Sequence, residues 1–170
     1  RRGDEHVNDM SQDVVVIALG ARHRGDDAIG PLVAAALRAG GPPCRIVEGC
    51  DDTLSLLNAW ETAALAIVVD AAVGGAAPGT VHRLDGEDAP AVKDLARCSS
   101  HGLGLAEAMR LGRVLGRLPA RLVVFAVEAK TFALGAAPSA AVAATVPVLV
   151  KSIADEVGRF RHTELQRSHA

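Results

Sequence analysis

The sequence has few aromatic side chains: its 170 residues include three phenylalanines, one tryptophan (Trp60) and no tyrosine. Few side chains could therefore stack on bases, no run of basic residues is present, and the net charge is −2. This composition gives little support to nucleic-acid binding. Of the residues, 49% are nevertheless hydrophobic. Because so few of them are aromatic, the core must consist of valine, leucine, isoleucine and alanine. The length and the 22% of charged residues are typical of a single globular domain.

Disulfide, secretion and membrane patterns are also lacking. Cys44, Cys50 and Cys98 are odd in number and include no C-x-x-C pair, which predicts reduced thiols. Residues 1–12 are polar and charged and show no secretion signal, so we expect a cytoplasmic protein. The stretch 133–150 has no charge over 18 residues, but it is mostly alanine and is interrupted by prolines. We interpret it as a loop followed by a buried helix and not as a membrane span.

Short β-branched runs alternate along the chain with segments of helical spacing. The apolar runs predict strands at residues 13–20, 45–48, 65–71, 80–84 and 121–127. Apolar periodicity and capping residues predict helices at residues 27–39, 52–62 and 99–115, and from Ser139 onward with a kink at Pro147.

This alternation predicts an α/β fold. We expect a three-layer sandwich in which a mostly parallel, twisted sheet of about five strands has helices on both faces. Residues 13–160 should form one domain. Residues 1–12 and 161–170 should be flexible tails.

Several polar residues should gather at one rim of this sheet. Ligands of a doubly wound sheet bind beyond the carboxyl ends of its strands. Asp26 and Asp27 follow the first strand, Asp70 ends the third, His101 precedes a helix, and Glu128 ends the last strand. All five should therefore face the same crevice.

Three of these residues form a candidate metal site. A carboxylate that ends a buried strand is costly unless it is paired or bound to metal, although Asp70 could instead cap a turn. Asp26 and Asp27 could cap the following helix, and we assign that role to Asp26. Two carboxylates, Asp27 and Asp70, together with the imidazole of His101, are a suitable donor set for a divalent transition metal.

Rival chemistries fit less well. No G-x-S-x-G nucleophile motif is present, and Ser99 and Ser100 are better explained as helix caps. The loop from Gly20 to Asp27 lacks the G-x-G-x-x-G pattern, and its two aspartates would repel a pyrophosphate at the helix start.

Three runs resemble the hydrogenase maturation proteases, the endopeptidases that trim the C-terminus of the large subunit of nickel–iron hydrogenases. They are ALGARHRGDDAIGP (18–31), IVVDA (67–71) and SSHGLGLAEAM (99–109). The segments 85–91, 127–135 and 139–150 add to the resemblance, which thus covers almost the whole chain outside the tails. The chain departs from the family pattern where Asp27 replaces a frequent glutamate and where Ala21 replaces the asparagine of a G-x-G-N loop.

The resemblance implies that Asp27, Asp70 and His101 contact nickel and are the catalytic and metal-binding residues. It implies no permanent cofactor: the nickel arrives with the hydrogenase large-subunit precursor, and other divalent ions can occupy the same site. If the metal does not polarise the scissile bond, Asp27 is our choice to activate water. We expect a monomer that acts on this precursor and binds neither nucleic acid nor membranes.

Two alternatives stay open. The same cluster could belong to a non-proteolytic metal-binding assembly factor of hydrogenase maturation, or to an aspartate-type endopeptidase that needs no metal.

Overall fold

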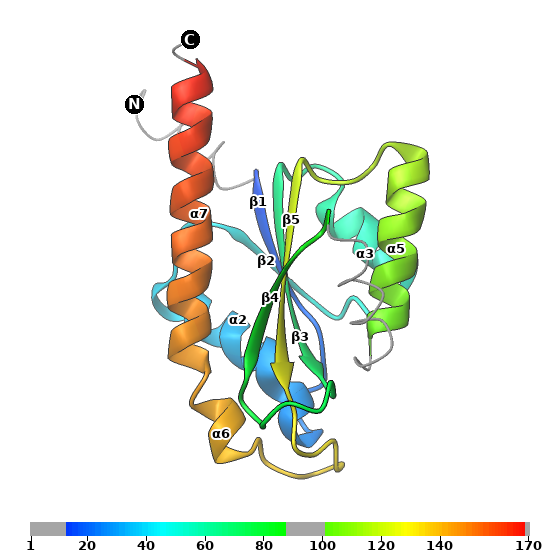
Figure 1. The fold of residues 1–170 in the computed structure, drawn as a ribbon, viewed down its shortest axis with the longest axis vertical. Coiled ribbons are helices and arrows are strands. Elements are labelled where there is room, and N and C mark those ends of the chain that lie inside the picture. The colour runs from blue at the N-terminus through cyan, green and yellow to red at the C-terminus, as the bar shows by residue number, and fades with distance from the viewer. Residues whose placement is uncertain (1–12, 88–100, 169–170) are drawn as a thin grey trace.

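The computed structural model describes residues 13–87 and 101–168. Within them, one five-stranded sheet has the order β2-β1-β3-β5-β4 (Figure 1). Its strands are β1 (Val14–Ala18), β2 (Arg45–Glu48), β3 (Leu65–Ala72), β4 (Val81–Asp85) and β5 (Arg121–Glu128). Every neighbouring pair is parallel except β4 and β5, which are antiparallel. The predicted mostly parallel sheet is confirmed.

The central strands are buried on both faces, which is why they consist of continuous apolar runs. All residues of β1 and β3 are buried, and so is β5 after its first residue. The edge strand β4 is partly exposed and includes the polar residues His82, Arg83 and Asp85. Covered faces favour the β-branched runs from which these strands were predicted.

Helices cover both faces of the sheet, in agreement with the predicted three layers (Figure 1). The helix α2 (Ile29–Gly40), the short α6 (Ala140–Ala143) and α7 (Val146–Ser168) pack on one face. On the other face lie α3 (Thr53–Trp60) and α5 (Gly102–Leu115). Before α2, the chain forms one 3-10 turn, η1 (Gly25–Ala28).

The C-terminal part differs from the prediction in two ways. A kinked helix was predicted around Pro147, whereas the chain forms two helices. Pro147 is the second residue of α7, where its missing N–H costs no helical hydrogen bond. The flexible tail predicted from residue 161 is instead helical as far as Ser168.

Other expectations are only partly covered by the described residues. The predicted tail 1–12 lies outside them. Cys44 and Cys50 are free thiols, as predicted, whereas Cys98 is outside the described part. Burial raises the pKa of both described thiols. No helix among the described residues is both long and apolar enough to cross a membrane.

Candidate metal centre

Asp27, Asp70 and His101 converge on one point. Each offers one ligand atom, and these atoms all lie within 4.8 Å of one another. A tetrahedral ion bound at about 2.1 Å would hold its ligand atoms about 3.4 Å apart, so small side-chain rotations would close the cluster around it. The convergence expected from the strand ends is therefore observed. The catalytic and metal-binding roles of these residues stay predictions.

Asp70 is positioned by the middle strand of the sheet. It lies on β3 beside Ala126 of β5, and its strand neighbours Val68 and Ala72 face the core beneath α3 and α5. Because side chains alternate along a strand, Asp70 points to that same face. Its side chain is fully buried, and its Oδ1 accepts the N–H of Ala71 at 2.9 Å. The strand continues for two residues, so Asp70 lies within β3 and not in the turn after it.

His101 occupies the N-cap position of α5, on the face to which Asp70 points. Its Nδ1 lies 3.3 Å from Asp70 Oδ1, and its side chain is 18% exposed. The hydrogen bond to Asp70 is the main cause that raises the pKa of His101. Burial opposes it, and the charges of Asp70, Asp27 and Asp51 add to it. A metal ion and a proton therefore compete for this imidazole.

Asp27 comes from η1, directly after the loop that follows β1. It is 1% exposed, and its Oδ2 accepts the N–H of Ala21 at 3.0 Å. Neither η1 nor α2 has a side-chain cap, so the capping role considered for both aspartates is wrong. Ser99 and Ser100, the predicted caps of α5, lie outside the described residues.

Asp26 has a role that the sequence did not reveal. Its buried carboxylate accepts three backbone N–H groups from the connection between β5 and α6: those of Lys130, Thr131 and Ser139. Burial acts to raise the pKa of Asp26, but these bonds outweigh it and hold the pKa below its ordinary value. No local pattern could indicate this role, because the partners lie at least 104 residues away in sequence.

Glu128 reaches the rim but is not a member of the cluster. Its carboxylate accepts the N–H of Gly74, with a shortest distance of 2.9 Å, and lies 3.0 Å from Nε2 of His82. It therefore fastens the loop between β3 and β4.

A family comparison adds to this geometry. The model of the HycI hydrogenase maturation protease family matches residues 33–156, well over half of the chain. The chain belongs to the hydrogenase maturation protease family. The protease is therefore a hydrolase, an endopeptidase of hydrogenase maturation, as the sequence predicted. Asp70 and His101 lie inside the matched range. Asp27 lies before the matched range, so its place in the cluster is supported by the geometry of the structure and not by the family match.

Solved structures of similar proteins have the same fold. The hydrogenase maturating endopeptidase HybD from Escherichia coli is 25% identical with a TM-score of 0.77, covering 87% of the protease and 93% of HybD. The [NiFe] hydrogenase maturation protease HybD from Thermococcus kodakarensis is also 25% identical, with a TM-score of 0.69 and coverage of 86% and 99%. No curated protein matches the sequence significantly.

Proposed function

We propose that this endopeptidase removes the C-terminal extension of a hydrogenase large-subunit precursor that already carries nickel. Asp27, Asp70 and His101 would contact that nickel. The observation that carries the proposal is the convergence of two buried carboxylates and one imidazole in a member of this family.

The charge of the cluster supports a cationic substrate group. Asp27 and Asp70 are both almost fully buried, and two buried carboxylates so close together repel each other unless a cation joins them. Within the three-residue cluster, the imidazole of His101 can carry at most one positive charge against the two carboxylates. A divalent ion brought by the precursor would add positive charge between the two carboxylates, and carboxylate and imidazole ligands suit nickel.

The partial exposure of His101 supports an approach from its side. Among the three side chains it is the one with an appreciable exposed fraction, 18%, whereas the two aspartates lie beneath the surface. A metal embedded in a protein substrate would meet this imidazole first. Asp70 would hold the imidazole in place through the 3.3 Å contact to its Nδ1.

The hydrolytic step needs an activated water molecule. A metal ion can polarise the scissile carbonyl, or it can position the peptide while a carboxylate acts as the base. We assign the base to Asp27, because η1 places it at the rim where the loops from β1 and β5 meet. Asp70 and His101 would orient the metal.

The test is an incubation of the purified protease with nickel-loaded and nickel-free precursor, followed by a gel and by mass spectrometry of the released peptide. Trimming of the loaded precursor alone supports the proposal. Absence of cleavage, combined with nickel binding, would favour the non-proteolytic assembly factor. Equal trimming of both precursors would favour the metal-independent endopeptidase.

A further inference from the structure

Asp26 binds a distant part of the chain through its carboxylate. Its Oδ2 accepts the N–H of Lys130 at 2.6 Å and that of Thr131 at 3.1 Å, while its Oδ1 accepts the N–H of Ser139 at 2.6 Å. The side chain is fully buried. Bonds between a carboxylate and backbone N–H groups are stronger than those between neutral groups, so this side chain holds the segment 130–139 firmly.

Backbone hydrogen bonds join the same two loops. The N–H of Asp26 donates to the carbonyl of Thr131 at 2.9 Å, and the N–H of Gly25 donates to that of Ala136 at 3.1 Å. The N–H of Gly135 returns a bond to the carbonyl of His23 at 2.7 Å. At Gly25, which has a φ of +59°, a Cβ atom would lie 2.6 Å from the Thr131 oxygen. The loops therefore touch closely at the residue before Asp26.

Asp27 is the next residue of the same 3-10 turn, but its side chain points elsewhere. It reaches Asp70 and His101, whereas Asp26 reaches the segment 130–139. Successive residues of a 3-10 turn are rotated by about 120°, so fixing one side chain fixes the direction of the other. The turn has no side-chain cap that would hold it independently.

We propose that Asp26 is a positioning residue: by fastening η1 to the segment 130–139, it holds the Asp27 carboxylate at the metal centre. This inference rests on the proposed function for its catalytic consequence. Its geometric content concerns only how Asp27 is held.

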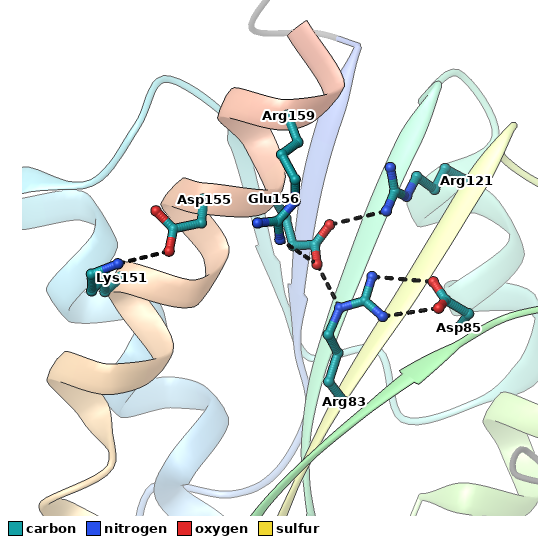
Figure 2. A network of polar contacts seen from close by, with 7 residues as sticks. All are labelled: Arg83, Asp85, Arg121, Lys151, Asp155, Glu156 and Arg159. Atoms are coloured by element: carbon teal, nitrogen blue, oxygen red, sulfur yellow. Dashed lines mark hydrogen bonds and ion pairs between the residues drawn. The ribbon is translucent and has the colours of Figure 1, made fainter. Parts of the chain in front are cut away.

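The test compares Asp26→Asn with a matched control elsewhere in the protein. Asparagine keeps the size of the side chain but loses the charge, and its amide N–H₂ faces backbone N–H donors. Glu156 is a suitable control because it is equally buried, on α7, and contacts Arg83, Arg121 and Arg159 (Figure 2).

The control lies far from the site. Arg121 begins β5, and the segment that Asp26 holds follows the end of β5, about 23 Å away along the strand. Glu156→Gln should thus reduce stability without moving Asp27.

Two readouts separate positioning from general destabilisation. Under conditions where both variants are fully folded, Asp26→Asn should lower kcat on nickel-loaded precursor by about a hundredfold, because a misplacement near 1 Å has that effect. KM should stay within about twofold, since the docking surfaces are unchanged. Affinity for Zn²⁺, measured by calorimetry on the free protease, should fall by about tenfold or more. Glu156→Gln should leave both the kinetic constants and the Zn²⁺ affinity unchanged.

A second pair of variants keeps the test decisive if Asp26→Asn does not fold. Ser139→Pro removes one N–H that Asp26 accepts, and the φ of −62° at Ser139 suits proline. Ser139→Ala is the matched control: both variants lose the serine hydroxyl, but only the alanine variant keeps the N–H. Lower kcat and Zn²⁺ affinity in the proline variant than in the alanine variant would support the proposal.

Unchanged kcat and Zn²⁺ affinity in folded Asp26→Asn, or equal values for the two Ser139 variants, would overturn the positioning role. So would a loss through KM alone. If the unmodified protease binds Zn²⁺ but cleaves no precursor, the proposed function fails, and the Zn²⁺ comparison still decides the role of Asp26. If it does neither, both proposals are wrong.

Discussion

Replacing Asp27 by asparagine should separate the chemistry of the site from the stability of the fold. The substitution keeps the shape of a side chain that is 1% exposed, and an amide oxygen can still accept the N–H of Ala21. It removes the negative charge that would bind a metal or activate water. We expect a folded protease that no longer trims its precursor.

The magnitudes follow from the contacts of Asp27. A hydrogen bond to a neutral acceptor contributes about 1 kcal/mol less than one to a charged acceptor. Removing the charge also ends the repulsion with Asp70, which is at least about 3 kcal/mol because the two ligand atoms lie within 4.8 Å of each other, taking an effective dielectric constant near 20. When His101 carries a proton, the substitution also ends an attraction of similar size to the imidazolium, so the two electrostatic effects oppose each other. A net change of about 1 kcal/mol corresponds to a shift in Tm of about 2–4 °C.

Catalysis should suffer far more. Loss of a catalytic acid–base group lowers rates by about a hundredfold or more, equivalent to about 2.7 kcal/mol in the barrier. Calorimetry would give Tm, and a time course of precursor trimming on a gel would give the rate. Trimming at the normal rate would refute the assignment of Asp27. A fall in Tm above about 10 °C would refute the electrostatic reasoning.

Three further outcomes are expected. Thiol titration of the unfolded, unreduced protein should find three reactive groups, Cys44, Cys50 and Cys98, whereas a single group would indicate a disulfide. Burial acts to raise the pKa of Glu156, but hydrogen bonds from Arg83 and Arg159 outweigh it and hold the pKa below its ordinary value. The charged carboxylate therefore stabilises the folded protein fully above about pH 4.3, and this stabilisation is lost as the pH falls through the lowered pKa. Glu156→Gln should therefore flatten the acid side of a stability curve from urea unfolding, and an unchanged curve would contradict this account. Because its bond to Asp70 raises the pKa of His101, calorimetry should find weaker Zn²⁺ binding at about pH 6 than at about pH 8, and equal affinities would argue against His101 as a ligand.

The strands and the convergence of the three site residues could be predicted from the sequence because their signals are local. A β-branched run such as Leu65–Ala72 indicates a buried strand without reference to the rest of the chain. The parallel arrangement then places the carboxyl ends of β1 and β3 at one rim, which brings Asp27 near Asp70. His101 was found because a helix start lies at the same rim.

The errors concern one contact between distant segments and the length of the last helix. Asp26 has the local features of a helix cap, but its carboxylate oxygens accept backbone N–H groups from the segment after β5. No sequence pattern indicates such a tertiary contact. At the C-terminus, polar residues after 160 gave the appearance of a loose tail. They continue α7 as a mainly exposed extension of a helix whose buried residues include Ile153 and Phe160.

The measurement that tests the central claim most directly is the trimming of a nickel-free precursor before and after nickel is added back. We expect no size shift without nickel and restored trimming once the precursor is loaded, with neither Asp27→Asn nor His101→Ala trimming the loaded form. Complete trimming of the nickel-free precursor would contradict the claim that Asp27, Asp70 and His101 act on substrate-borne nickel.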